Sequence, residues 1–361
     1  MEEPQHSSLQ PYLPSDEYRP EPVPKPPPPI GMDGTLRIGI HTSIAGDVCS
    51  ALELANQLGA NALQIFSASP RMWCRGTSKA VDLAAQRFRQ RRAELGLGPL
   101  VIHGNYLVNL ASSQRVLRVR SIQAFHDEIV RAIALGADFL VAHPGCACGL
   151  EVNAAIAAIA DGLKQAARGL NFGGLRILLE NTAGQGTSVG SRFSELKTIL
   201  DLCPDLPLGI CVDTAHLFAA GHDLRSADGL ERALQEISGT VGLERVFVVH
   251  MNDSKTALGS RVDRHEHIGK GKIGREAFHR ILAHPLLAGR AFILETPIDH
   301  PGDDRRNVNA LWRLAGEKPR SARRAADGFR IRQRAARPRR KVAARRKIRH
   351  ARKLRARERV A

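Results

Sequence analysis

The sequence predicts an α/β protein in which eight strand–helix units close into a (β/α)8 barrel, with an extension at each end. Short apolar runs alternate with amphipathic stretches over about 280 residues. Runs such as Ile-Leu-Leu at 177–179 and Val-Phe-Val-Val at 246–249 are apolar at consecutive positions, as parallel strands buried on both faces must be. An open doubly wound sheet is the alternative. No Gly-x-Gly-x-x-Gly follows the first run, so the barrel is favoured.

The eight expected strands end where polar or turn-forming residues begin. They cover residues 36–40, 62–66, 100–103, 138–143, 175–180, 208–213, 245–250 and 291–295. The segments between them place apolar side chains three and four residues apart, which is the spacing of one helical face. The expected helices cover residues 45–58, 79–95, 113–135, 152–168, 192–200, 226–237, 274–282 and 304–314. Eight units of this length match the size of one barrel.

The two ends of the chain differ from this pattern. Residues 1–34 contain 10 of the 20 prolines. Since proline removes backbone donors, we expect a disordered arm that is a passive linker or a docking segment for a partner. Residues 317–361 hold 20 Lys and Arg against 3 Asp and Glu, so the net charge of +17 lies entirely there. We expect a disordered basic tail, and residues 35–316 are left as the barrel domain.

The basic tail predicts contact with nucleic acid. About twenty cations on a flexible segment bind the DNA backbone by counterion release, without sequence preference. A nuclear-localisation signal and an RNA- or ribosome-binding tail are the alternatives. The Ala/Arg-rich composition is more typical of a bacterial basic tail. We therefore expect a cytoplasmic, nucleoid-associated protein, with a nuclear location as the alternative.

Composition excludes several classes of protein. Apolar residues make up 43% of the chain, enough for a substantial core, and no window of about 18 apolar residues indicates a membrane span. The first residues lack the apolar region of a secretory signal. Six cysteines without an export signal are expected to be thiols in a reducing compartment. We expect no membrane partner, no disulfide scaffold and no fully disordered chain.

Residues that carry chemistry gather at the ends of the expected strands. Six of the eight runs finish on His103, His143, Glu180, Asp213, His250 and Glu295. In a barrel the carboxyl ends of the strands converge on one rim, where active sites form. His216 follows Asp213 by three residues. Asp263 and His265 have the i, i+2 spacing that puts both side chains on the same side of an extended backbone.

These nine side chains predict a metal centre. Imidazoles and carboxylates that lie close together must be paired, protonated or bound to cations. Mixed nitrogen and oxygen ligands indicate zinc or a similar first-row metal rather than magnesium or calcium. With three or four protein ligands per ion and a bridging carboxylate, nine ligands suit two or three ions. Such a cluster can clamp a phosphate and lower the pKa of a water toward neutrality.

Several longer motifs occur in order along the expected barrel. They are Ile-Gly-Ile-His-Thr-Ser at 38–43, Gln-Ile-Phe at 64–66, Pro-Arg-Met-Trp at 70–73, His-Gly-Asn-Tyr-Leu-Val-Asn-Leu at 103–110, His-Pro-Gly at 143–145, Leu-Glu-Asn-Thr-Ala-Gly-Gln-Gly at 179–186, Asp-Thr-Ala-His at 213–216, Ala-Gly-His-Asp at 220–223, His-Met-Asn-Asp-Ser-Lys at 250–255, Asp-Arg-His-Glu-His-Ile-Gly at 263–269 and Leu-Glu-Thr-Pro at 294–297. On these motifs the sequence resembles the endonuclease IV family of apurinic/apyrimidinic (AP) endonucleases, over residues of about 36 to 315.

The resemblance implies a TIM barrel of the xylose-isomerase-like superfamily with three Zn2+ ions, and Mn2+ is possible at one position. The implied ligands are His103, His143 and Glu180 for the first ion, Asp213, His250 and Glu295 with the bridging Glu180 for the second, and His216, Asp263 and His265 for the third. Every ligand position of the family is filled. The departures from the family pattern include Met72 beside Arg71, and Lys270 in a loop that is often acidic in relatives.

The implied activity is hydrolysis of the phosphodiester on the 5′ side of an abasic site in double-stranded DNA, as a step of base-excision repair. The products are a 3′-hydroxyl and a 5′-deoxyribose phosphate, and the family also trims blocked 3′ ends. Glu180 is the expected catalytic proton acceptor for the attacking water. Arg71, Tyr106 and Leu107 are expected on loops that enter the duplex and contact the DNA. The family precedent suggests a monomer.

Other polar residues are expected at most to support the ligands. The candidates are His41, Gln64, Asn181, His222, Asn252 and His267, since metal-bound histidines need hydrogen-bond partners. Cys146 and Cys148 follow His143 and are interpreted as small buried residues rather than a metal site.

Two other functions stay open. A metal-dependent sugar isomerase or epimerase on a related barrel would need fewer histidines and would lack the Asp263–His265 pair. A non-catalytic DNA-binding scaffold would depend on the basic tail. It would have no physical need to hold so many charges at one rim.

Overall fold

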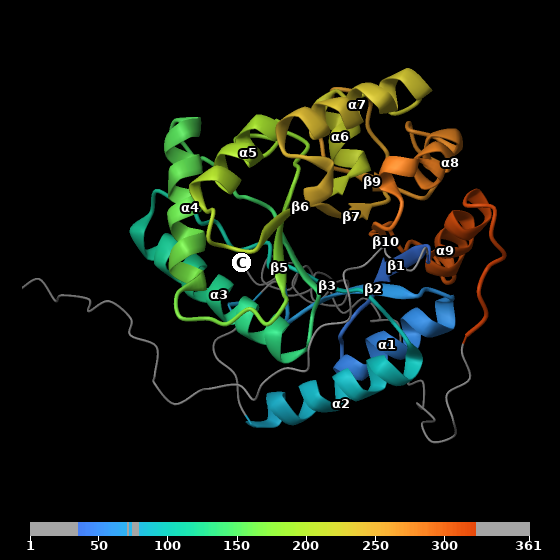
Figure 1. The fold of residues 1–361 in the computed structure, drawn as a ribbon, viewed down its shortest axis with the longest axis horizontal. Helices are drawn as coiled ribbons and strands as arrows, with labels where there is room; N and C mark the ends of the chain where they lie inside the picture. Colours follow the sequence, from blue (N-terminus) through green and yellow to red (C-terminus); the bar gives the residue numbers. More distant parts are fainter. Residues whose placement is uncertain (1–34, 71, 74–78, 323–361) are drawn as a thin grey trace, which may run out of the picture. The chain divides into compact units, whose positions relative to one another are not determined.

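Eight parallel strands form a closed barrel in a computed structural model that describes residues 35–70, 72, 73 and 79–322 (Figure 1). Around the barrel, β1 pairs with β2, the strands follow in order to β7, and β10 closes the ring between β7 and β1. The strands are β1 (Arg37–His41), β2 (Ala62–Phe66), β3 (Leu100–His103), β4 (Phe139–Ala142), β5 (Arg176–Glu180), β6 (Leu208–Asp213), β7 (Val246–His250) and β10 (Ala291–Leu294). The predicted fold class is confirmed. The predicted arm, most of the tail and Arg71 lie outside the described residues.

Helices surround the ring of strands (Figure 1). They are α1 (Val48–Leu58), α2 (Lys79–Leu95), α3 (Arg115–Ala134), α4 (Val152–Ala167), α5 (Phe193–Leu202), α6 (Thr214–Ala220), α7 (Ala227–Thr240), α8 (Arg275–Ala283) and α9 (Asp303–Leu314), with 3-10 turns η1 (Leu243–Arg245) and η2 (Pro285–Leu287). The sequence did not predict α6, because seven residues are too few to show a helical period. No helix in this part of the chain has the length and apolarity needed to cross a bilayer.

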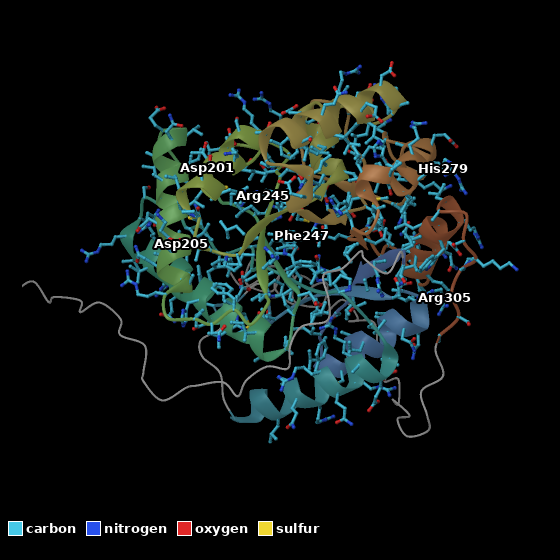
Figure 2. All side chains as sticks on the ribbon, in the orientation of Figure 1. Asp201, Asp205, Arg245, Phe247, His279 and Arg305 are labelled. Carbon is cyan, nitrogen blue, oxygen red and sulfur yellow. The ribbon has the colours of Figure 1, made fainter. Side chains whose placement is uncertain are left out.

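Two apolar layers stabilise the barrel. The outer layer lies between strands and helices, and the inner layer fills the barrel with Ala62, Val101, Phe139, Val141, Leu178, Cys211, Val248, Ala291 and Ile293. Near the amino ends of the strands, the ring of Phe139 lies 5.4 Å from that of Phe247, whose position is labelled in Figure 2, and the guanidinium of Arg176 stacks over the Phe247 ring. Each fully buried Leu, Ile or Phe contributes roughly 1.5–3 kcal/mol. The filled interior leaves the chemistry to the rim at the other end.

Gly209 shows how closely the strands pack. A Cβ atom built at this position would lie 2.8 Å from Leu178 Cδ2 and from two ring carbons of Phe247. Glycine is therefore needed here for close approach, because no larger residue leaves room for the aromatic side chain.

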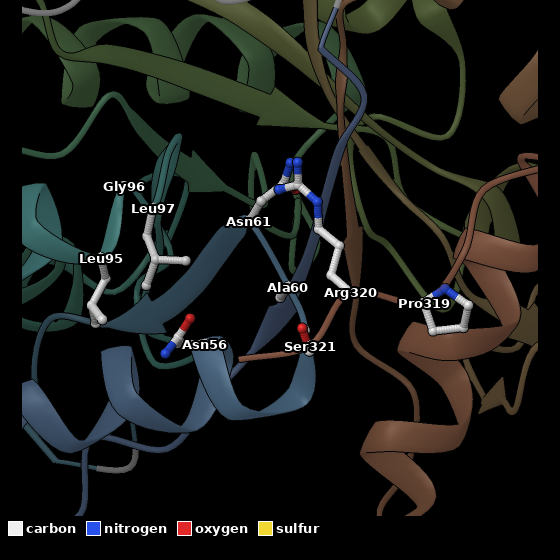
Figure 3. Close-up of a pocket in the computed structure, with 10 residues that line it drawn as sticks. Asn56, Ala60, Asn61, Leu95, Gly96, Leu97, Pro319, Arg320 and Ser321 are labelled. Atoms are coloured by element: carbon white, nitrogen blue, oxygen red, sulfur yellow. The ribbon is translucent and has the colours of Figure 1, made fainter. Parts of the chain in front are cut away.

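A cavity of about 360 Å3 lies at the amino ends of the strands, beside residues that precede β2 and β3 (Figure 3). Arg320 lines it and stacks over Trp312, with 5.2 Å between the guanidinium carbon and the ring centroid. Trp312 Nε1 donates a 3.0 Å hydrogen bond to the carbonyl of Gly59. The start of the basic segment therefore packs on the barrel. This cavity is at the opposite end from the histidines and carboxylates, so it is not the candidate active site.

Candidate metal centre

The nine predicted ligand side chains meet at the carboxyl ends of the strands. Their ligand atoms form three overlapping groups, in each of which all atoms lie within 4.8 Å of one another: His103, His143 and Glu180; Glu180, Asp213, His250 and Glu295; Asp213, His216 and His265. Asp263 joins the third group, with its two carboxylate oxygens 3.2 Å from His216 Nε2 and 3.3 Å from His265 Nε2. Glu180 and Asp213 each belong to two groups and link the three into one centre.

The barrel positions this centre through its strand ends. His103, Glu180, Asp213 and His250 are the last residues of β3, β5, β6 and β7, and Asp213 pairs with His250 across the sheet. His143 follows β4 directly, and Glu295 follows β10. Parallel strands bring these ends to one rim, because all eight strands run in the same direction around the closed sheet.

Asp213 has two structural roles at once. It is the N-cap of α6, and its Oδ1 accepts a 2.8 Å hydrogen bond from the backbone N–H of His216. Its Oδ2 faces the centre, 3.7 Å from His265 Nε2. Because Asp213 both ends β6 and caps α6, the short helix starts directly at the rim and places His216 in the site.

Three histidines are oriented by backbone carbonyl groups. The Nδ1 atoms of His103, His216 and His265 lie 2.8, 2.9 and 3.3 Å from the carbonyl oxygens of Gly104, Asn181 and Glu295. If Nδ1 carries the proton and donates it to the carbonyl, the Nε2 lone pair faces the carboxylates. This is the arrangement by which proteins fix the tautomer of a metal-binding imidazole.

His250 is oriented in the opposite sense. Its Nε2 lies 2.9 Å from Oε1 of Gln64, and its Nδ1 faces the centre at 2.9 Å from Glu180 Oε1. Nδ1 also lies 3.3 Å from Glu295 Oε2. Gln64 thus selects the nitrogen that His250 presents.

The pKa values of the buried ligand groups show how strongly the carboxylates at this centre favour nearby positive charge. Burial raises the pKa of the Glu180 carboxyl, but His250, His143 and His103 together hold that pKa well below its usual range. Burial lowers the pKa of His216, yet the carboxylates of Asp213, Asp263 and Glu180 raise it to about 10. The carboxylates at the rim therefore keep the His216 imidazole protonated unless other positive charge replaces that proton, whereas burial outweighs them at His143 and lowers its pKa.

Unpartnered polar atoms show that metal ions fit this centre. Glu180 Oε2 and His265 Nε2 are buried and make no hydrogen bond within the described chain, although His143 Nε2 and Asp263 Oδ1 respectively lie 3.3 Å from them. A buried polar atom without a partner is costly, and both atoms face the shared space between the ligands. Four carboxylates and five imidazoles are also the donor set that zinc and similar metals prefer. The residues present therefore fit a metal centre.

Four of the six predicted supporting residues contact the ligands. Gln64 Nε2 donates to Glu295 Oε1 at 2.5 Å and lies 3.0 Å from His41 Nδ1, which is itself 3.9 Å from Glu295 Oε1. Asn181 Oδ1 accepts from the backbone N–H of Asp213 at 2.7 Å. Asn252 Nδ2 donates to Asp213 Oδ2 at 2.6 Å, and its Oδ1 accepts from the backbone N–H of Glu295 at 2.9 Å. These amides hold the carboxylates in place.

The other two supporting candidates have different contacts. His222 Nδ1 lies 3.6 Å from a carboxylate oxygen of Glu236 on α7. His267 Nδ1 lies 3.0 Å from Nδ2 of Asn307 on α9. No contact with a ligand is found for either histidine within the described residues, so no supporting role is assigned to them.

Two of the three predicted DNA-contacting residues, Tyr106 and Leu107, lie at the edge of the same rim, and the third, Arg71, is outside the described residues. Tyr106 is 66% exposed and Leu107 is 36% exposed. The Tyr106 ring lies 5.5 Å from the rings of both Phe66 and His103. Burial, then Glu295 and Glu180, raise the pKa of its hydroxyl to about 12, so it stays neutral. On the neighbouring loop, Met72 is 61% exposed.

Sequence reasoning missed the role of Asp253, which follows Asn252 and begins β8 (Asp253–Ser254). This strand pairs with β9 (His265–Glu266), which carries His265. Asp253 is fully buried and accepts hydrogen bonds of 2.9–3.0 Å from the backbone N–H groups of Gly269, Gly271 and Ile273. It thereby fixes the loop that follows β9, on which Lys270 is exposed. The glycine spacing at 269, 271 and 274 was the available signal.

Cys146 and Cys148, which follow β4, are not buried as predicted. Cys148 is exposed, with φ of 47°, and Cys146 is partly exposed. The interpretation of both as small buried residues is therefore wrong, because the loop carries them to the surface beside Asn109. The five cysteines of the described chain have free thiols.

Comparison with known proteins identifies the family. A family model described as "Xylose isomerase-like TIM barrel" matches residues 52–327. The "Probable endonuclease 4" of Solibacter usitatus is 51% identical over 286 residues, which cover 78% of this chain and 98% of that protein. The crystal structure of endonuclease IV from Thermus thermophilus is 40% identical, covers 78% of this chain and 99% of that chain, and superimposes with a TM-score of 0.67.

Sugar-converting relatives share the barrel at much lower identity. A D-tagatose 3-epimerase-like protein is 19% identical, covers 78% of this chain and 98% of that chain, and has a TM-score of 0.57. This likeness is one of fold alone. On the identity and coverage of its relatives and on the converging ligand set, the chain belongs to the endonuclease IV family of AP endonucleases, a family of hydrolases.

Proposed function

We propose that the protein is a zinc-dependent AP endonuclease of base-excision repair. It would hydrolyse the phosphodiester 5′ to an abasic site in double-stranded DNA, leaving a 3′-hydroxyl and a 5′-deoxyribose phosphate, and would also trim blocked 3′ ends. The observation that carries the proposal is the convergence of all nine ligand side chains at one rim. Membership of the endonuclease IV family supports the same activity.

Three ions would be held by the overlapping groups. The proposed ligands are His103, His143 and Glu180 for the first, Asp213, His250, Glu295 and the shared Glu180 for the second, and His216, Asp263 and His265 for the third. The bound ions would supply Lewis acidity, which stabilises charge on the phosphate and favours deprotonation of the attacking water.

The protein's own groups would orient and deprotonate the water. Glu180 Oε2 is buried at the centre, 3.3 Å from His143 Nε2, and makes no hydrogen bond among the described residues, so it would be free to accept a proton from the water. Gln64 and Asn252 hold Glu295 and Asp213 through hydrogen bonds and keep those carboxylates from rotating away. Such pre-positioning reduces the reorganisation that hydrolysis requires.

Lesion recognition is proposed for the loops after β2 and β3. Tyr106 and Leu107 are exposed next to the centre and would enter the duplex where a base is missing. Arg71 would contact the DNA from the neighbouring loop. A missing base lowers the cost of this insertion, since no stacked base must be displaced.

The basic tail is proposed to tether the enzyme to the DNA backbone without sequence preference. Residues 317–361 carry the whole excess positive charge, while the remaining chain is neutral. Electrostatic attraction would raise the local concentration of DNA and assist scanning. We propose a monomer that is associated with the nucleoid.

The test is incision of a duplex that carries one abasic-site analogue, with metal content measured on the same samples. We expect cutting 5′ to the lesion and close to three zinc ions per chain. Glu180→Gln should abolish cutting, whereas the control Glu276→Gln, an exposed position on α8, should cut like the parent. A zinc-loaded protein that leaves the duplex intact would refute the proposed activity and direct attention to small carbohydrates. A protein without bound zinc would refute the ligand assignment.

A further inference from the structure

The two loops proposed to contact DNA meet at Asn105, the residue before Tyr106. Its side-chain Nδ2 donates hydrogen bonds to the carbonyl oxygens of Met72 at 3.0 Å and of Ser69 at 3.5 Å. Both carbonyls belong to the loop after β2, which is 33 or more residues away in sequence. One amide therefore joins the loop that carries Arg71 to the loop that carries Tyr106.

The same side chain also shapes its own loop. Asn105 Oδ1 accepts a 2.8 Å hydrogen bond from the backbone N–H of Leu107, which closes a local turn around Tyr106. The acceptor of Asn105 thus acts within the loop after β3, and the donor acts between the two loops. These two functions of the side chain can be separated by substitution.

Helix α3 braces this junction from behind. Both carboxylate oxygens of the buried Glu128 accept from the backbone N–H of Asn105, at 3.0 and 3.2 Å. One turn further on, the buried Arg131 donates from Nε to Ser67 Oγ at 3.1 Å, on the loop after β2. The backbone of Asn105 is therefore held in place, and its amide can reach the neighbouring loop at little entropic cost.

We propose that Asn105 is a positioning residue that holds the loop after β2, at Ser69 and Met72, against the loop after β3 and so sets the preference for abasic over intact DNA. The inference rests on the proposed function of these loops. A pre-formed unit does not have to be ordered when DNA binds, so the binding energy of Tyr106 and its neighbours goes into insertion. Uncoupled loops would bind intact and abasic duplexes more equally.

The test is Asn105→Ser in the full-length, zinc-loaded protein. A serine hydroxyl can still accept from the Leu107 N–H and keep the turn, but it is too short to reach Met72 or Ser69. Since two hydrogen bonds are lost, we expect KM for the abasic duplex to rise roughly five- to tenfold, with kcat changed less than about twofold. The ratio of affinities for abasic and intact duplex should fall by a similar factor.

A second readout measures the coupling without catalysis. Hydrogen exchange of a peptide covering residues 67–73 should accelerate at least about threefold in Asn105→Ser, although the substitution is remote in sequence. The matched control is Asn171→Ser, since Asn171 closes a similar turn with Gly173 at the opposite end of the barrel. It should leave KM and this exchange rate unchanged.

The outcomes separate this inference from the proposed function. Faster exchange at 67–73 without any incision by the parent protein would support the coupling and refute the activity. Incision by the parent, with the KM of Asn105→Ser and its exchange at 67–73 both unchanged, would overturn the coupling and leave the activity standing.

Discussion

At the scale of single residues, Glu128 shows how a buried carboxylate can serve loop geometry. It lies on α3 behind the rim and accepts two hydrogen bonds from one backbone N–H. Burial raises the pKa of its carboxyl from 4.5 to about 7, against the opposing effects of the Asn105 N–H, Arg131 and His103, while Asp127 reinforces the shift. The ionised form is therefore tolerated here at a cost in stability.

This shift predicts a pH dependence with a definite sign. Between pH 4.5 and about 7, the folded protein keeps a proton on Glu128 that the unfolded chain has already released. The free energy of unfolding therefore falls as pH rises through that window. Glu128→Gln removes this titration. We expect the free energy of unfolding of the unmodified protein minus that of Glu128→Gln to fall by roughly 2–3 kcal/mol between pH 5 and pH 8, measured by urea unfolding. A difference that does not vary with pH would contradict the prediction.

At the scale of elements, the β8–β9 pair and the loop after it form a support for His265. The fully buried Asp253 holds this support together through backbone N–H groups that are 16 or more residues away. Such a carboxylate replaces the ladder hydrogen bonds that a two-residue strand cannot supply. The third ligand group therefore depends on a residue that is not itself a ligand.

Asp253→Asn should weaken this support. An amide nitrogen would face backbone N–H groups where an oxygen now accepts from them, which costs roughly 2–4 kcal/mol of stability. We expect a lower unfolding midpoint and less than the parent's zinc content, measured by thermal unfolding and metal analysis. Asp201→Asn, on the exposed end of α5 (Figure 2), is the control and should match the parent. Equal zinc content in both variants would show that the loop does not support the third site.

At the scale of the whole molecule, negative and positive charge are concentrated in two separate regions of the chain. The rim concentrates four carboxylates in a buried centre, and the tail concentrates cations at one end of the chain. Bound cations at the rim would neutralise the first region, and a nucleic-acid backbone would neutralise the second.

Metal removal should therefore destabilise the fold. A ligand that binds only the folded state stabilises it by about 4 kcal/mol at a thousand times its dissociation constant. Prolonged chelation should lower the thermal unfolding midpoint by several degrees, and added zinc should restore it. Scanning calorimetry would measure both steps, and an unchanged midpoint would argue against ions bound to the folded state.

Truncation of the tail should act on DNA binding and leave chemistry intact. The truncation is placed after Arg323, because Arg320 packs on Trp312 and belongs to the barrel. Affinity for DNA should fall, and the slope of log affinity against log salt should flatten by several units, since each lost phosphate contact removes nearly one. Turnover at saturating substrate should stay within about twofold of the parent. A slope that persists after truncation would rule out the tether.

Much of this protein follows from local sequence pattern. Apolar runs and helical periods predicted the barrel, because the pattern of apolar residues within each unit indicates which of its faces is buried. The strand-end positions of Glu180, Asp213 and His250 then predicted their meeting, because parallel strands in a closed sheet must bring their ends to one rim.

Only the tertiary structure decided which atoms face one another. The nitrogen that His250 presents depends on Gln64, which lies 186 residues away, and the link between the recognition loops depends on where Asn105 stands relative to Met72. The surface position of Cys148 and the support of His265 by Asp253 have the same origin. These contacts are set by distances between residues far apart along the chain. Periodicity carries no information about such distances, because it records only which face of an element each residue occupies.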